Sequence, residues 1–515
     1  MRPFLERLWF GFVLALFFFF RSQSEYTAYT RYFRRFILFV SFMFPVFLIT
    51  AALFYFAAPG KYRPALLFAF SCLFCSWLGL RSLFFVFALS VFTFFAARLI
   101  EKNRLCAHPL RSRIWSVFSI AFCLLLMAGY KYIPYFLQVR GLTELVPDPV
   151  LGHLAVPIGL SFYLFQAIGY LADVSAGKCS SETNFVYFGL YMTYFPKFVS
   201  GPIESFQDFV PQLSKLRKLK FLDRGRLSLA FTYLLYGYFM KLVIADRLSP
   251  LVGVIFEAPE NFDSLWLAIG AFLYTIQIYC DFAGYSFIAL GCSRLFGISL
   301  TPNFVTPYFA ENITQFWRRW HVSLSRWLRD YVYIPLGGNR KGFWRKCVNT
   351  LIVFLLCGMW HGAGLSFVAW GLLHGLFCVA DSLLKKRGKK LPFSRLTTFL
   401  EVAFAWIFFR ASGLGSALKY IFLLFTCGIR PGQTQEILKT LNLDLIEILV
   451  ILIGILLVFL MDYHGYKNHM LFPELVQEKD NSVRYMIFYV LIILLFIFGI
   501  YGPGYHTEQF IYMQF

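Results

Sequence analysis

The feature that most constrains this chain is a series of long, uninterrupted apolar stretches. Three of the clearest are residues 36–58, 115–137 and 483–501. Each is about twenty residues long, enough for a helix to cross a hydrocarbon layer about 30 Å thick. Because they do not alternate between apolar and polar residues, they exclude the strands of a membrane β-barrel. The sequence therefore predicts an all-α, polytopic integral membrane protein with about ten to twelve transmembrane helices.

The charged residues indicate how the chain lies in the lipid bilayer. The 515 residues are 59% hydrophobic and 15% charged, with a net charge of +21. The basic residues form short runs between apolar stretches rather than one soluble face, so we expect no nucleic-acid partner. By the positive-inside rule the runs face the cytoplasm, and the acidic connections face the opposite side. The basic runs are Arg31 to Arg35, Lys102 to Arg113, Lys215 to Lys220, Arg318 to Lys346 and Lys385 to Lys390; the acidic connections are 144–148 and 257–263.

The eleven cysteines do not predict a metal site. Most lie scattered in apolar stretches, and the close pair Cys72 and Cys75 has no polar neighbours. No Cys/His grouping has the spacing of structural zinc ligands. We expect neither a metal nor a bound cofactor.

The first residues resemble a secretory signal, with basic residues before an apolar run. No small-residue cleavage site follows Phe20. We expect a retained membrane segment.

Polar residues divide the chain into three predicted parts. Residues 1–137 have few polar residues inside their apolar stretches and are predicted to be a transmembrane scaffold with little chemistry. Residues 138–382 hold most of the buried polar pattern and are predicted to be the functional core. Residues 383–515 are predicted to contain spans near 398–426, 446–462 and 483–501 and then an aromatic tail.

The core contains segments that do not read as clean spans. Within residues 154–213, a predicted span that carries Gln166 and Asp173 leads into a second stretch, 191–213. That stretch holds Lys197 between prolines, which predicts a re-entrant or broken helix buried in protein. Two further spans are predicted at 227–256 and 264–291. The second holds Asp281, which is expected to line something polar or to pair with a buried base. Asp281 could either make a structural hydrogen bond or take part in the chemistry, and the sequence leaves both roles open.

Residues 301–346 carry charges every few positions and predict an amphipathic helix on the cytoplasmic side. Its apolar face would hold Trp317, Trp320, His321, Leu324, Trp327, Leu328 and Tyr331. His321 is the exception on that face. Ser323, Ser325 and Asn312 could orient one of its ring nitrogens, although a lone histidine is more often a satisfied core residue.

The sequence GMWHGAG places His361 within a strongly apolar segment. Gly358, Gly362 and Gly364 surround it, and each glycine disfavours a helix by about 1 kcal/mol relative to alanine. The glycines therefore predict close backbone approach or open space. An ionisable side chain at this depth is a functional-site hypothesis by default. His374, in the same segment, is expected to be structural.

The run PNFVTPYFAENITQFWRRWHVSLSRWLRDYVYIPLGGNR, followed by GMWHGAG, resembles the membrane-bound O-acyltransferase family. It is most similar to the bacterial branch that acetylates alginate and related cell-wall polysaccharides. The resemblance covers residues 150–375 strongly, and the terminal FIYMQF adds weaker support. Where the family tends to read DFSGYSD, this chain has DFAGYSF, so Ala283 and Phe287 replace a hydroxyl and an acid.

The resemblance implies a catalytic core around a central tunnel that joins the two faces of the membrane. The family's invariant histidine falls on His361 and its second histidine on His321. The residues expected to line the donor path are Trp317, Trp320, Asn312, Ser323, Trp360 and Asp281.

The implied reaction is acyl transfer from a cytoplasmic thioester, acetyl-CoA or an acyl carrier. His361 would act as general base and His321 would position the donor, although the roles could be exchanged. The acceptor would be an extracytoplasmic polysaccharide, reached through a separate extracytoplasmic transferase. The resemblance also implies that the protein is located in the cytoplasmic membrane of a bacterium.

Two other functions are compatible with parts of this sequence. Relatives in the family transfer D-alanine to teichoic acid, and the terminal FIYMQF favours acetylation over that reaction. A transporter without covalent chemistry would also suit broken helices and buried histidines. Transport without covalent chemistry does not require the WRRWHVSLS segment together with WHG, so these two segments favour the acyltransferase.

The aromatic C-terminal tail is too apolar for a disordered end. We expect it to pack back into the bundle, either as an aromatic plug or with Tyr512 as an acyl relay activated by His361.

Overall fold

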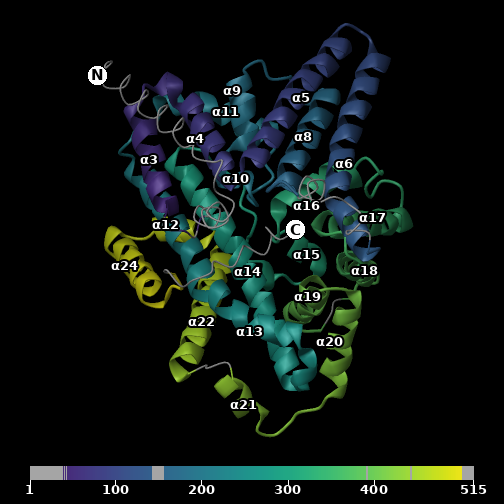
Figure 1. Cartoon of the computed structure of the whole chain (residues 1–515), viewed down its shortest axis with the longest axis vertical. Helices are drawn as coiled ribbons and strands as arrows, with labels where there is room; N and C mark the ends of the chain where they lie inside the picture. The colour runs from purple at the N-terminus through teal and green to yellow at the C-terminus, as the bar shows by residue number, and fades with distance from the viewer. Residues whose placement is uncertain are drawn as a thin grey trace.

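The computed structural model describes residues 39, 41, 43–141, 156–389, 392–440 and 444–501, and the statements below concern these residues. Every regular element in these ranges is a helix (Figure 1). The prediction of an all-α, multi-pass membrane fold is confirmed.

Seven helices in the described ranges are long and apolar enough to cross a membrane. They are α5 (Leu80–Leu105), α6 (Pro109–Val139), α14 (Ser264–Leu295), α17 (Phe343–His361), α18 (Leu365–Lys386), α22 (Leu445–Asn468) and α24 (Asn481–Phe498). Most expose large apolar side chains; in α24 Leu491 alone is buried. By contrast, α14 is buried along most of its length and runs through the middle of the bundle (Figure 1). The site is assembled around this central helix.

Shorter helices fill the spaces between the long ones. At the N-terminal side of the described chain α3 (Met43–Ala57) and α4 (Arg63–Leu78) pack together. Near the C-terminal side α21 (Gln433–Thr440) and α23 (Phe472–Gln477) flank α22.

The expected span at 227–256 is interrupted near its middle. It consists of α12 (Arg224–Tyr238), a π-helical turn η5 (Phe239–Ala245) and α13 (Asp246–Glu257). A π turn brings residues five apart onto the same face. Lys241 accordingly lies 2.7 Å from Asp246 while it also pairs with Asp281 of α14. The expectation that Asp281 pairs with a buried base is confirmed, and this ion cluster explains the break.

The broken segment predicted at residues 191–213 is confirmed: it is made of the end of α9 (Phe185–Thr193), α10 (Phe195–Phe198) and α11 (Phe206–Lys215). The helix α8 (Leu160–Ser175) lies where the preceding span was expected. The buried Lys197 ammonium donates to the carbonyl of Tyr191 at 2.7 Å and to the side chain of Gln166. The break therefore lets a lysine stay buried, because freed carbonyls and an amide surround its charge.

The apolar stretch at 398–426 is two helices rather than one. α19 (Ser394–Arg410) ends before an Ala-Ser-Gly turn, and α20 (Leu414–Thr426) begins after it. A Ser-Gly pair favours a turn, and the hydropathy pattern alone hid it.

The single amphipathic helix expected within 301–346 is wrong. The chain forms α15 (Ile313–Trp317), a turn, then α16 (Val322–Leu328) and a π turn η8 (Arg329–Tyr333). Asn303 causes the break, because its backbone carbonyl accepts from Val322 N and its Oδ1 accepts from Ser323 N, both at 3.1 Å. These two N–H groups can no longer continue the preceding helix. The predicted apolar face therefore does not exist as one face, because a turn separates Trp317 in α15 from Leu324 in α16.

Glycines bring α17 and α18 into backbone contact beside the site. A Cβ atom on Gly358 would lie 2.3 Å from the carbonyl oxygen of Phe367, and one on Gly371 would lie 2.3 Å from that of Phe354. Small residues allow such approach between membrane helices. The close approach predicted around His361 is confirmed at Gly358.

Changing Gly371 to alanine is expected to destabilise the protein by about 1–3 kcal/mol, because the new methyl group forces α17 and α18 apart. Thermal unfolding in detergent measures this. Gly415→Ala in α20 is the matched control, since its Cβ would have no neighbour within 4 Å. Equal unfolding temperatures for the two variants would contradict the close contact.

Candidate active site

His321 is held in an unusual backbone conformation at the start of α16. Its φ and ψ are 44° and 53°, the left-handed region, and it is the N-cap residue of the helix. Such a conformation is uncommon outside glycine and marks strain that the surroundings maintain. The hydrogen bonds that Asn303 accepts from Val322 N and Ser323 N hold the turn in place. The turn directs the side chain into the protein, where His321 is fully buried.

His361 is the last residue of α17. The helix stops there because Gly362 takes an extended conformation, with φ of −164°. The side chain of His361 is 1% exposed. Its ring packs against Trp370 of α18 and Phe409 of α19, at centroid distances of 5.0 and 5.4 Å. Three helices thus fix its position.

The structure brings the two predicted histidines together. Their ring centroids lie 6.5 Å apart, although 40 residues separate them in the sequence. Trp360 contacts both rings, at 5.9 Å from His321 and 4.8 Å from His361. Two imidazoles at this separation can act on one reacting group placed between them.

The surroundings of the pair are aromatic. Phe162 of α8 stacks on His321 at 6.3 Å, and Phe282 of α14 meets the same ring edge-on at 4.8 Å. Burial lowers the pKa of His321 to about 3. His321 is therefore a neutral imidazole at neutral pH, which accepts a hydrogen bond at one ring nitrogen and donates one from the other. An apolar cage also excludes water and strengthens the electrostatic interactions inside it.

Trp317 and Trp320 lie in the aromatic core rather than between the histidines. Trp317 Nε1 donates to Nδ1 of His374 at 3.3 Å, which gives His374 a structural partner. Trp320 is fully buried and packs against Phe304 and Trp406.

Asn312 and Ser323 both bind backbone groups. Asn312 caps α15 by accepting from Gln315 N at 2.8 Å. Ser323 Oγ accepts from Ile203 N at 2.9 Å. Both side chains position the segment that carries His321.

Trp360 and Asp281 have different surroundings. Trp360 touches both histidines, and its buried Nε1 has no hydrogen-bond partner among the described residues. Asp281 lies in the ion cluster with Lys241 and Asp246, one residue before the Phe282 that contacts His321. Of the six residues expected along the donor path, Trp360 alone is in ring contact with both histidines.

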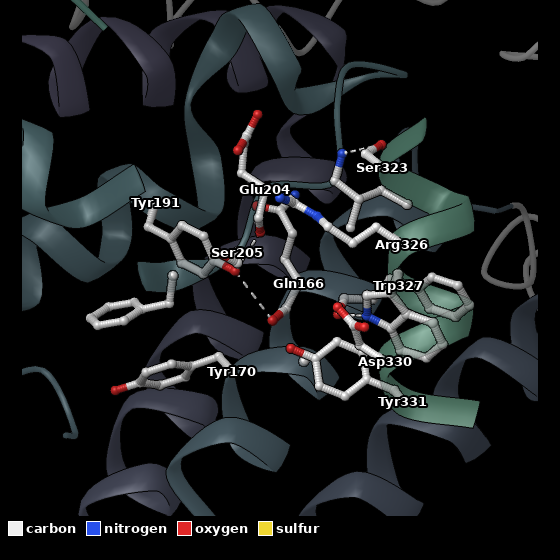
Figure 2. A pocket seen from close by; sticks show the side chains of 14 residues that line it. Gln166, Tyr170, Tyr191, Glu204, Ser205, Ser323, Arg326, Trp327, Asp330 and Tyr331 are labelled. Atoms are coloured by element: carbon white, nitrogen blue, oxygen red, sulfur yellow. Dashed lines mark hydrogen bonds between the residues drawn. The ribbon is translucent and has the colours of Figure 1, made fainter. Parts of the chain in front are cut away.

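A polar pocket lies along α16, and neither histidine is among the residues that line it (Figure 2). It holds about 340 Å³ of empty space, its open mouth included. Ser323, two residues after His321, forms part of the wall. Arg326 also lines the pocket and pairs with Asp208 at 3.1 Å, and the carboxylates of Glu204 and Asp330 lie in the same wall. The polar side chains around it come from α8, α9, the α10–α11 connection and α16 with η8; they are Gln166, Tyr170, Tyr191, Glu204, Ser205, Ser323, Arg326, Asp330 and Tyr331. The pocket provides polar surface next to the apolar cage.

The sequence analysis missed two residues of the N-terminal scaffold. Tyr132 Oη donates to the carbonyl of Met359 at 2.8 Å, and Lys131 Nζ donates to the carbonyl of Trp360. Both come from α6, where little chemistry was expected. The one signal in the sequence was a lysine inside an apolar stretch, in GYKYIPYF.

Tyr512 and the rest of the aromatic tail lie outside the described residues. The relay and the plug both stay predictions.

Comparison with known proteins bears on the same segments. A family model described as membrane-bound O-acyltransferase family matches residues 174–418, which include both histidines. A protein of Pseudomonas putida named probable alginate O-acetylase is 31% identical over 90% of this chain and 96% of its own length. A peptidoglycan O-acetyltransferase of Helicobacter pylori is 33% identical over 67% of this chain and 72% of its own. A teichoic acid D-alanyltransferase of Bacillus subtilis is 28% identical over 49% of this chain and 66% of its own. This chain, with its paired buried histidines, is an O-acyltransferase that belongs to the membrane-bound O-acyltransferase family.

Proposed function

We propose that this protein transfers an acetyl group from a cytoplasmic thioester to a cell-surface polysaccharide, with His361 and His321 at the reacting centre. The observation that carries the proposal is the buried contact between two histidines from separate segments, 6.5 Å apart within an aromatic cage. The relatives named for alginate and peptidoglycan acetylation support the acetyl group and the polymer acceptor. The class of acceptor is thereby a carbohydrate hydroxyl.

In the proposed reaction His361 takes the proton from the attacking hydroxyl as its oxygen bonds to the thioester carbonyl carbon. The carbon–sulfur bond then breaks, and the same proton passes to the departing thiolate, so atoms and charge balance. General-base help of this kind is worth about 10²- to 10⁴-fold.

His321 and Trp360 have proposed positioning roles toward the donor. Burial keeps His321 neutral at neutral pH, so it can hold the thioester by a hydrogen bond. The buried Nε1 of Trp360 is a donor next to both rings, suited to the carbonyl oxygen as negative charge develops on it.

The donor is proposed to arrive from the cytoplasm, as free acetyl-CoA without a tightly bound cofactor. The basic runs offer positive charge to the phosphates of coenzyme A. A separate extracytoplasmic transferase is the proposed partner that completes transfer to the polymer. The proposed location is the cytoplasmic membrane of a bacterium.

Purified protein in lipid vesicles tests the donor and the acyl group. With labelled acetyl-CoA on the side of the basic runs, label is expected to reach a soluble carbohydrate acceptor on the other side, which stands in for the partner transferase and its polymer. Label transferred from a D-alanyl carrier protein and not from acetyl-CoA would instead establish alanylation. Movement of the intact donor across the vesicle without cleavage of the thioester would overturn the proposal.

Cysteine labelling tests the proposed donor side. Lys218→Cys and Lys389→Cys should react with a membrane-impermeant maleimide applied from the cytoplasmic side, because both lie in basic runs. Asp148→Cys, in a connection outside the described residues, should not react. The parent protein needs Cys106→Ser, since Cys106 is exposed. Reaction at position 148 from the cytoplasm would reverse the orientation and the donor side.

A further inference from the structure

The end of α17 poses a problem that the catalytic proposal leaves open. A helix leaves its last carbonyl groups without partners inside the helix, and at membrane depth water is scarce. Gly362 N satisfies the carbonyl of Gly358 at 3.2 Å. The carbonyls of Met359 and Trp360, just before His361, need donors from elsewhere.

Two consecutive residues of α6 supply these donors. Tyr132 Oη donates to Met359 and Lys131 Nζ donates to Trp360. The lower end of α6 reaches α17 and α18 in Figure 1. Lys131 Nζ also lies 5.6 Å from the centre of the Trp360 ring, over its face. One lysine therefore holds both the backbone and the side chain of the residue next to His361.

The position of this cation is electrostatically consistent. The C-terminal end of a helix carries partial negative charge, which favours a cation in its last turn. A cation over a tryptophan face gains a further ~0.5–2 kcal/mol. A charged side chain within a membrane helix otherwise costs about 2.5–3.5 kcal/mol, so its placement here calls for a use.

We propose that Lys131 is a positioning residue for acyl transfer, which fixes the Trp360–His361 end of α17 against the His321 ring. The hydrogen bond from its ammonium group to the Trp360 carbonyl fixes the position of the last turn of α17 along the helix axis. Its contact with the face of the Trp360 ring fixes the orientation of the indole. The proposal rests on the role of His361 at the reacting centre. It adds a residue from the N-terminal scaffold to the machinery.

The test is a series at position 131 in the full-length protein, assayed with acetyl-CoA. Lys131→Met keeps the length of the side chain and removes the charge and the donor. It is expected to lower kcat by about 10- to 100-fold, because small misplacements of a catalytic group have effects of that size. The KM for the donor is expected to stay unchanged, since the donor-binding surface is intact. Lys131→Arg, which keeps charge and donors, should recover most of kcat, and Lys131→Gln should lie between the two.

Three controls separate the possible outcomes. Arg140→Met, an exposed cation at the end of α6, should leave kcat and unfolding temperature unchanged. Tyr132→Phe should give a smaller loss than Lys131→Met, because it removes one neutral hydrogen bond. His361→Ala, run in parallel, tests the underlying catalytic role. An active His361→Ala variant would contradict the proposed function, whereas an inactive one beside a fully active Lys131→Met would contradict this inference alone. If Lys131→Met does not fold, equal kcat values for Lys131→Arg and Lys131→Gln with the wild type also overturn the inference.

Discussion

Replacement of His361 by alanine is expected to lower acyl transfer by about 10²- to 10⁴-fold, the usual size of general-base help. The variant should still insert and fold, because the histidine ends a helix whose contact with α18 depends on Gly358 and Gly371. The measurement is release of coenzyme A and labelling of a carbohydrate acceptor by purified protein in vesicles.

A matched control for His361 is His464→Ala. His464 is exposed on α22, and its ring bonds only to a backbone carbonyl of its own helix among the described contacts. Its loss should leave the rate unchanged. More than about a tenth of wild-type activity in His361→Ala would exclude the general-base role, given the usual size of that effect.

The second large effect is expected at His321, where two causes must be separated. His321→Ala removes the imidazole and also places alanine in a left-handed conformation that it rarely adopts. His321→Asn removes the imidazole but keeps a residue that tolerates this conformation. Both should lose about 10²-fold in transfer, comparable to the loss of one well-placed polar group. The alanine variant should also unfold at a lower temperature.

Kinetics of His321→Asn decide whether His321 takes part in the reaction. A rate equal to the wild type at both saturating and limiting donor would make His321 a structural residue of the α16 turn. A loss confined to limiting donor would instead assign it to donor binding.

Much of the candidate site was predictable because its two histidines are polar residues in apolar stretches of sequence. His361 stands out as an ionisable group among glycines in an apolar segment, and His321 as a polar residue on an apolar face. The break in residues 154–213 was also predictable, since Lys197 between prolines cannot sit in a regular lipid-facing helix. These signals are local, so they survive in a single sequence.

Lys131 shows what was not predictable. A lysine inside an apolar stretch signals a polar partner, but a long side chain can also extend to the membrane surface, so the sequence does not say which partner Lys131 has. Its actual partner, the Trp360 carbonyl, lies 229 residues later in the chain. No periodicity connects two such positions.

The sequence by itself determined the class of the protein and its membrane-spanning character, and it singled out the two histidines that the structure brings together. Lipid has no hydrogen-bonding capacity, so hydropathy and misplaced polar groups carry strong information about a membrane chain. The tertiary structure alone decided where helices break and which residues meet. The left-handed turn at His321 depends on Asn303, and the 6.5 Å approach of the histidines depends on α8, α14 and α18 packing around them. Such contacts join distant segments by side-chain shape and hydrogen bonding, which the spacing of residues along one helix does not encode.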